Sequence, residues 1–233
     1  MSNKKSIHGT TLALALAACA ALPAAAQQTP WYGAFSAGQS KTDHEFVTNR
    51  EGAISNAINI RTDFDDKDSA WKATLGYRVN SWLALEVNYA DYGSVRSDTR
   101  FDVPGGLNGF GGVTVDREVK GFGIDGLISA PIGDRFSVFG RVGAFRAETR
   151  ANARISGDTF FTDGTPGTER SNKSTETTVK YGVGADWYFT PQFAVRLEYE
   201  RLDSVGKKFE SGQSGTTGEA AVDTLMIGAI FRF

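Results

Sequence analysis

Cysteine is almost absent from this chain of 233 residues, which holds a single one, Cys19. The chain can therefore form no internal disulfide and no site built from several thiolates. Proline is scarce at six residues, and no apolar run approaches the ~20 residues that a membrane-spanning helix needs. An excess of basic residues is also missing, because 25 Lys and Arg face 27 Asp and Glu. This balance argues against nucleic acid as a partner.

The amino terminus has the layout of an export signal. Lys4 and Lys5 begin it, an apolar stretch follows, and the small residues up to Ala26 form a cleavage site. Residues 1–26 are therefore predicted to be removed. An alternative stays open, because the residues before Cys19 resemble a lipoprotein processing box in which that cysteine would carry lipid.

Residues 27–233 are long enough for one β domain. Removing the signal takes away two of the 25 basic residues and no acid, so the net charge becomes 23 − 27 = −4. It also removes the only cysteine. The remaining chain then has no thiolate catalyst.

What the chain does contain is alternation with a period of two. In the last stretch every second residue is apolar, namely Leu225, Ile227, Ala229, Phe231 and Phe233. This period predicts a β-strand with one apolar face. The same pattern predicts eight strands, over residues 31–40, 70–79, 82–92, 119–130, 135–147, 177–189, 193–202 and 221–233.

The predicted connections alternate between long and short along the chain. Tight turns contain Asn80, Gly133 and Pro191, and the long polar loops cover residues 41–69, 93–118, 148–176 and 203–220. Short turns on one side and long loops on the other are typical of barrels in the bacterial outer membrane. We therefore predict an all-β fold, an eight-stranded antiparallel up-and-down transmembrane β-barrel whose apolar rows face lipid.

The opposite rows of the strands are polar and would face the lumen. An eight-stranded barrel is just wide enough for its own side chains. Charges inside it are costly unless they are paired. The inward rows hold six bases and five acids: Lys72, Arg78, Arg141, Lys180, Arg196, Arg232, Glu86, Asp125, Asp186, Glu198 and Glu200.

From these rows we predict a lumenal charge network. Its members are Glu86, Asp125, Arg141, Lys180, Asp186, Arg196 and Glu198. Such a network would either fill the barrel as a plug or switch a narrow path for ions.

A few basic residues fall on the outward rows near the loop ends. They are Lys120, Arg146 and Arg201. These side chains could bind lipopolysaccharide phosphates, because Lys and Arg pair well with phosphate. Alternatively, they could extend toward the headgroups without specific contacts.

Candidates for catalysis and for metal binding are weak. The only histidine after the signal, His44, lies beside Asp43 and close to Ser40, but catalytic triads are assembled from separated elements. The acids between Asp63 and Asp68 lack the glycine and the final glutamate of a calcium-binding loop. We therefore expect no enzyme activity, no metal and no cofactor.

Several short runs resemble the transmembrane domain of the outer membrane protein A family. The run from Phe189 to Pro191, followed by residues 194–199, resembles the last turn and the seventh strand of that domain. Residues 31–34 and 85–89 resemble its first and third strands. The ending Phe231-Arg232-Phe233 resembles the terminal signal that the barrel-assembly machinery recognises.

The resemblance implies a monomer in the outer membrane, in contact with outer-membrane lipid and lipopolysaccharide. Larger members carry a peptidoglycan-binding domain after the barrel, whereas this chain ends at the barrel and is closer to short surface proteins. The expected role is structural or surface display, in envelope integrity, adhesion or weak diffusion, with an unidentified loop partner. Two alternatives are a narrow porin gated by Arg196 and Glu86, as the family implies, and a lipid A-modifying enzyme.

Overall fold

The computed structural model describes residues 30–43, 58–159, 168–208 and 217–233. Three sequence predictions fall outside these ranges: cleavage after Ala26, the alternative lipidation of Cys19, and the placement of His44. Among the described residues, no helix is long and apolar enough to cross a membrane.

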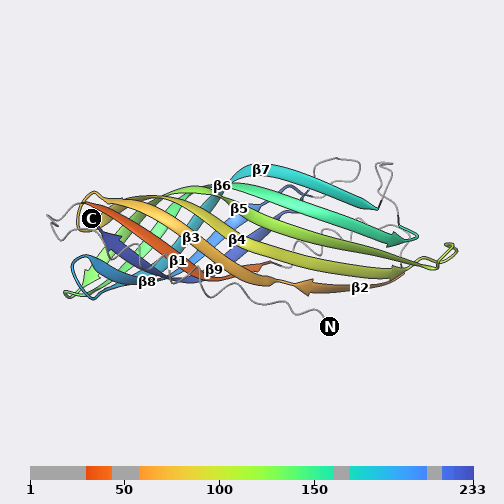
Figure 1. The fold of residues 1–233 in the computed structure, drawn as a ribbon, viewed down its shortest axis with the longest axis horizontal. Helices are drawn as coiled ribbons and strands as arrows, with labels where there is room; N and C mark the ends of the chain where they lie inside the picture. The colour runs from red at the N-terminus through yellow and green to blue at the C-terminus, as the bar shows by residue number, and fades with distance from the viewer. Residues whose placement is uncertain (1–29, 44–57, 160–167, 209–216) are drawn as a thin grey trace, which may run out of the picture.

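All regular structure in the described ranges is β-structure, and the strands alternate in direction (Figure 1). The strands are β1 (Trp31–Thr42), β2 (Ile58–Asp65), β3 (Lys67–Arg78), β4 (Leu83–Asp102), β5 (Phe110–Ile132), β6 (Phe136–Gly157), β7 (Glu169–Tyr188), β8 (Phe193–Val205) and β9 (Ala220–Arg232).

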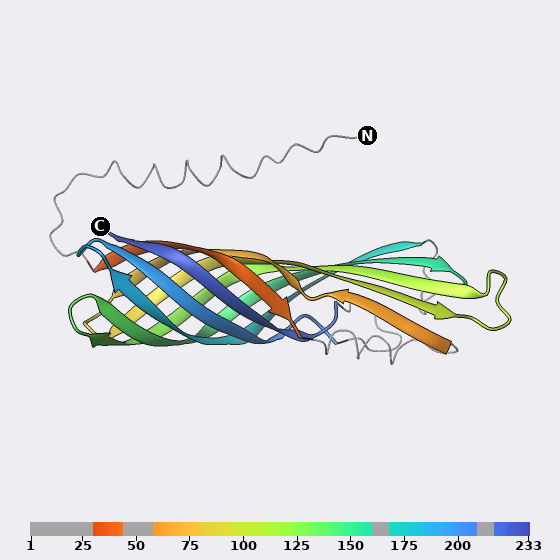
Figure 2. The same cartoon turned by 90° about the horizontal axis from the view of Figure 1, so that it is seen from below.

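Eight of these strands close into a ring. Going round it, β1 pairs with β3, then β4, β5, β6, β7, β8 and β9 follow, and β9 returns to β1. The closing pair is long, running from Tyr32 opposite Arg232 to Thr42 opposite Val222. The predicted eight-stranded antiparallel barrel is therefore confirmed. The carboxyl terminus and the short turns lie at one end of the ring (Figures 1 and 2).

The strands differ greatly in length. β4, β5, β6 and β7 contain 20 to 23 residues, whereas β1, β3, β8 and β9 contain 12 or 13. At about 3.3 Å per residue, some nine extra residues lengthen a strand by ~30 Å. Figure 2 shows the long strands continuing past the barrel as a protruding sheet, on the side away from the carboxyl terminus.

The prediction of long loops was therefore wrong for most of residues 93–118 and 148–176. Within 41–69 it was wrong for β2 and the start of β3. The physical reason is that the alternation reverses beyond the membrane. Val95 and Phe101 of β4 are buried there, while Arg96 and Arg100 point outward into water. A strand without an outward apolar row lacks the signature by which the other strands were found.

β2 belongs to the protruding sheet and not to the ring. It pairs with the outer part of β4, from Ile58 opposite Asp102 to Asp65 opposite Arg96. β4 thus pairs with β3 in its first part and with β2 in its outer part, and a bulge in β4 lies between the two parts. Gly93, in this bulge, has a φ of 77°. The carboxylate of Asp68 accepts the backbone N–H of Ser94 at 2.6 Å beside this bulge.

The apolar rows of the ring point outward, as predicted. Aromatic side chains gather at both edges of this belt. Near the protruding sheet, the ring of Tyr89 lies 5.5 Å from Trp71 and 4.9 Å from Phe122. Near the termini, Trp31 and Tyr77 lie 4.9 Å apart. Two such girdles mark the two interfaces of a membrane with water.

Candidate functional site

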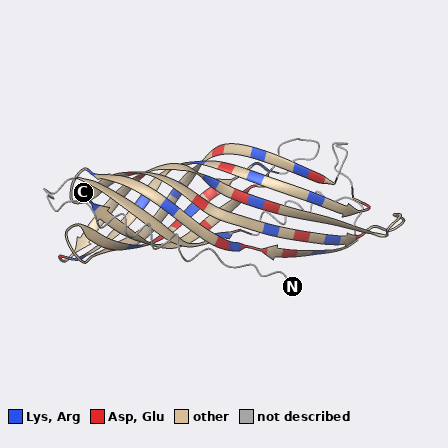
Figure 3. Cartoon of the chain, viewed as in Figure 1, with Lys and Arg blue, Asp and Glu red and all other residues tan. Residues whose placement is uncertain are grey.

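Nine charged side chains meet halfway along the inside of the ring, where Figure 3 shows basic and acidic residues on neighbouring strands. We call them the charge layer. Each is at most 4% exposed. The members are Lys72 of β3, Glu86 of β4, Asp125 of β5, Arg141 of β6, Lys180 and Asp186 of β7, and Arg196, Glu198 and Glu200 of β8. All seven residues of the predicted network lie here, joined by Lys72 and Glu200.

Glu86 is the branching point of the charge layer. Its Oε1 accepts a hydrogen bond from Nη1 of Arg196 at 2.6 Å, and its Oε2 accepts one from Nη2 of Arg141 at 2.9 Å. The hydroxyl of Tyr32, on β1, donates to the same carboxylate at 2.6 Å. Arg196 also donates from Nε to Asp186 at 2.8 Å. One carboxylate thus ties together strands that lie far apart in the sequence.

Arg141 carries the layer toward the opposite wall. Its guanidinium lies 3.1 Å from Glu198 and 3.5 Å from Asp125, and it also contacts Glu200. Lys72 lies 2.8 Å from Glu198 and contacts Glu200 as well. Because four of the five acids have more than one basic neighbour, and Asp186 joins them through Arg196, the contacts form a network and not a set of separate pairs.

Lys180 completes the layer beside β5. Its Nζ lies 2.8 Å from Asp125 and donates to the Asn88 side-chain oxygen at 2.9 Å. Asn88 donates in turn to Asp125 at 2.7 Å. Sequence reasoning did not assign Asn88 or Tyr32 to the network, because it followed charge alone. Their inward position in the alternation was the available signal.

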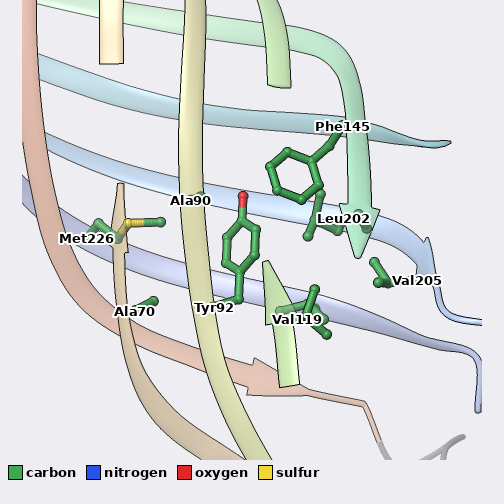
Figure 4. Close-up of a cluster of buried hydrophobic side chains, with 10 residues drawn as sticks. Ala70, Ala90, Tyr92, Val119, Phe145, Leu202, Val205 and Met226 are labelled. Atoms are coloured by element: carbon green, nitrogen blue, oxygen red, sulfur yellow. The ribbon is translucent and has the colours of Figure 1, made fainter. Parts of the chain in front are cut away.

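An apolar layer covers the charge layer on the side of the protruding sheet (Figure 4). On β3, β8 and β4 it begins with the next inward residue after Lys72, Glu200 and Asn88, in the direction of the protruding sheet. Its buried members are Ala70, Ala90, Tyr92, Val119, Phe145, Ala147, Leu202, Val205, Val222 and Met226. Phe145 also faces Nζ of Lys180, 5.5 Å from its ring centre.

A second apolar layer covers the other side, toward the short turns. It consists of Tyr32, Ala84, Leu127, Phe139, Ala194 and Ile230. The ring of Phe139 lies 4.5 Å from the guanidinium carbon of Arg196 and 5.4 Å from that of Arg141. Cations over an aromatic face are favourably placed. The charge layer is thus enclosed between two apolar layers inside a closed ring.

This arrangement separates the charges from water on both sides. The formal charge of the charge layer is near zero, since its four bases face five acids, 4 − 5 = −1. Such a layer can hold the strands in register and can exchange partners internally.

Two bases predicted in the inward rows lie outside the charge layer. Arg78 and Arg232 sit beyond the second apolar layer, near the short turns. Arg78 donates to the Tyr188 hydroxyl at 2.9 Å, and Arg232 lies 4.4 Å from the centre of the same ring. Both are only half-buried, because the ring opens toward water at this end.

The three outward bases predicted to bind lipopolysaccharide do not form one group. Lys120 on β5 and Arg146 on β6 are on neighbouring strands, but Arg201 on β8 lies beyond β7. Arg201 pairs instead with Asp223 at 2.7 Å and Asp43 at 3.7 Å. The binding of lipopolysaccharide by these bases stays a prediction.

The two terminal aromatic residues lie on the outward face near the short turns. The ring of Phe231 is 5.4 Å from Phe193 and 6.5 Å from Phe233. This row continues the aromatic girdle. Its recognition by the assembly machinery stays a prediction.

The candidate catalytic and metal-binding residues have structural contacts. Ser40 is buried and donates to the backbone oxygen of Tyr92 at 2.5 Å. Asp66 pairs with Lys41 at 3.6 Å, and Asp63 lies on the outer face of β2. Within the described ranges, no three His, Cys, Asp or Glu side chains are placed to hold a metal ion.

Comparison with known proteins gives one family. Residues 10–233 match the model described as the outer membrane protein beta-barrel domain. Outer membrane protein A of Shigella dysenteriae is 25% identical over 233 residues, covering 99% of this chain and 56% of that protein. Outer membrane protein P5 of Haemophilus influenzae is 27% identical over 200 residues, covering 82% and 50%. The chain thus spans about half the length of the curated relatives it matches.

Among solved structures, the chain is similar to that of Neisserial surface protein A. It is 15% identical, with a TM-score of 0.47, and the match covers 88% of this chain and 98% of that one.

The enclosure of the charge layer predicts the effect of Glu86→Gln. This change leaves two buried guanidinium groups without their shared carboxylate, and breaking a buried pair from one side costs about 3–5 kcal/mol. We expect a loss of that size in the free energy of unfolding, measured by urea titration in lipid vesicles. The control Glu118→Gln removes a surface partner of Lys120, 2.9 Å away, and should change little. Equal losses in both variants would contradict the central place of Glu86.

Proposed function

Since the chain belongs to the family of outer membrane protein beta-barrel domains, we propose that it is a sealed membrane anchor for a sheet displayed outside the cell. The displayed sheet serves surface attachment. The proposal includes export by residues 1–26, insertion by the barrel-assembly machinery, and a monomer in contact with outer-membrane lipid. It includes no enzymatic step.

The observation that carries this proposal is the protruding sheet. Four strands of the ring are some nine residues longer than the other four, which is ~30 Å at about 3.3 Å per residue, and β2 adds a fifth strand. The outer face of this sheet is charged and cross-linked, for example by Arg154 and Glu169 at 3.0 Å. A sheet stays in one shape far better than a loop of the same length. The barrel therefore presents its outermost turn in a defined position.

The turn between β4 and β5 is built to expose apolar side chains. Leu107 is fully exposed, and Phe110 is 54% exposed. Asp158 holds the turn from β6, because its carboxylate accepts the backbone N–H groups of Asn108 and Gly109, both at 2.8 Å. A preordered turn loses little conformational entropy on binding. An exposed apolar surface that is held in place can serve as an interaction site.

Attachment of cells that produce the chain would test the proposal. The double variant Leu107→Ser and Phe110→Ser removes both anchors but leaves the sheet pairing intact. We expect attachment to hydrophobic glass and to an epithelial cell layer to fall severalfold, toward the level of cells that lack the chain. Asp158→Ala should cause a smaller loss, because the turn is released while the anchors remain.

The control for this experiment is Thr175→Ala with Thr177→Ala. Both residues lie on the outer face of β7, close to the girdle and far from the turn. This variant should attach as the unaltered chain does. Attachment that is independent of Leu107 and Phe110 would contradict the proposed role.

A second candidate function is a narrow channel gated by Arg196 and Glu86. The contact of their side chains at 2.6 Å favours it. The two apolar layers argue against it, because exchange of partners within the charge layer leaves both layers closed.

Planar-bilayer recording separates these two functions. We expect the purified chain to give no discrete conductance steps, and Arg196→Ala to be equally silent while Phe139, Tyr92 and Met226 still fill the ring. Folding of both samples is checked by heat-modifiable gel mobility. Steps that appear or change in Arg196→Ala would favour the gate.

A further inference from the structure

One sector of the outer surface carries an excess of basic side chains where the belt meets the protruding sheet. It consists of the outward positions of β5, β6 and β7 just beyond the girdle, and we call it the basic sector. Its charged members are Glu118, Lys120, Arg146, Glu148, Arg150 and Lys173. Four bases face two acids, which gives 4 − 2 = +2.

The height of the sector follows from the strand register. Arg146 lies opposite Phe122 of β5 and Thr177 of β7. Phe122 contacts Tyr89 in the girdle, with ring centres 4.9 Å apart. Arg146 is therefore level with the interface, where lipid headgroups lie. Arg150 and Lys173 lie two periods of the alternation farther out than Arg146, directly opposite each other.

The bases of the sector are only partly satisfied by its acids. Glu148 is shared by Arg150 at 3.1 Å and Lys173 at 2.8 Å, while Glu118 pairs with Lys120 at 2.9 Å. Arg146 makes no ion pair with any residue that the structure describes. Several N–H donors are thus left facing the headgroup region. Phosphate oxygens are strong acceptors for them.

The rest of the perimeter lacks this excess. At similar height the outward strand positions of β1, β3, β4, β8 and β9 carry three bases and three acids, 3 − 3 = 0. They are Lys41, Lys67, Arg201, Asp91, Asp203 and Asp223. Asp91 lies opposite Lys120 and marks the border of the basic sector. Snorkelling of single bases does not explain why the excess falls on three adjacent strands.

An apolar hollow lies beneath the sector on the same side of the barrel. Its volume is about 630 Å³, and its wall includes Ile128, Gly140, Val183 and Tyr199. A side chain added at Gly140 would meet nothing within 4 Å, so the space above this strand is open to lipid. Gly140 lies six residues from Arg146 along β6, which is ~20 Å at 3.3 Å per residue. An acyl chain running down from the sector would reach it.

From these two features we infer that β5, β6 and β7 bind one phosphorylated glycolipid of the outer leaflet, of the lipid A type. Its phosphates lie on Arg146, Arg150 and Lys173, and one acyl chain fills the hollow over Gly140. The basic sector spans three strands, about 10 Å at 4.8 Å between neighbours, and ~13 Å along β6. That extent suits a headgroup with two phosphates better than the single phosphate of a phospholipid. The inference rests on the proposed placement of the protruding sheet outside the cell.

The test uses the whole folded chain in phosphatidylcholine nanodiscs, with bound lipid counted by native mass spectrometry. The probes are a bisphosphorylated lipid A, its monophosphorylated form and phosphatidylglycerol. For the triple variant Arg146→Gln, Arg150→Gln and Lys173→Gln, we expect bisphosphorylated lipid A to bind about tenfold more weakly, because charge-assisted contacts to both phosphates are lost. The unaltered chain should bind the monophosphorylated form and phosphatidylglycerol more weakly than the bisphosphorylated form.

The matched control removes the same number of charges elsewhere on the perimeter. Lys41→Gln, Lys67→Gln and Arg201→Gln should leave binding within about twofold of the unaltered chain, because all three lie outside the basic sector and two of them pair with Asp66 and Asp223. Gly140→Leu places a side chain in the hollow, where its Cβ meets no atom within 4 Å, and should weaken binding of the acylated probes while retaining the charges. Heat-modifiable gel mobility confirms that each variant is folded.

Three results would overturn the inference: equal losses in the two triple variants, no loss in the first, or phosphatidylglycerol binding as tightly as lipid A. Failure of this test is distinguishable from failure of the attachment role. Nanodisc binding does not involve Leu107 or Phe110, and attachment can be lost while glycolipid binding persists.

Discussion

The structure depends on the need to pair charges in a space too narrow for water to solvate them. Eight strands enclose little more than their own side chains, and nine of those side chains carry charge in one layer. Glu86 meets this constraint by joining Arg196 and Arg141, at 2.6 and 2.9 Å. Buried ion pairs do not reliably add stability, but losing one partner is costly. The layer therefore enforces one arrangement of strands and disfavours others.

The two apolar layers lie on either side of the charge layer and link the pairing of charges to the proposed function. Phe139 on one side and Phe145 on the other stand against the charges. A ring closed in this way is a rigid base in the membrane. The same strands can then continue outward as a sheet without opening the barrel. In the proposed role, rigidity inside, lipid contact around the belt and display outside all follow from one set of strands.

The sequence allowed the ring and most of its interior to be predicted, because lipid outside and charge inside impose a strict alternation. Beyond the membrane that contrast disappears. Arg96 and Arg100 point outward into water, so these segments of β4 resemble loops although the ladder continues through them. The neutral partners Tyr32 and Asn88 were missed because a charge pattern does not show which hydroxyl or amide will complete it. The ion pair of Arg201 with Asp223 was not anticipated, because the residue pattern of one strand does not show which residue of the next strand lies opposite it.

The most direct test of the central claim is side-chain hydrogen exchange in nanodiscs, followed by NMR. The Nε–H of Arg196 donates to Asp186 at 2.8 Å within the enclosed layer, whereas Arg146 is exposed on the outer surface. If the charge layer is sealed, the Arg196 Nε–H should exchange with solvent at least about a hundredfold more slowly than the Arg146 Nε–H. Equal exchange rates would show that water reaches the layer, and the account of a sealed anchor would be wrong.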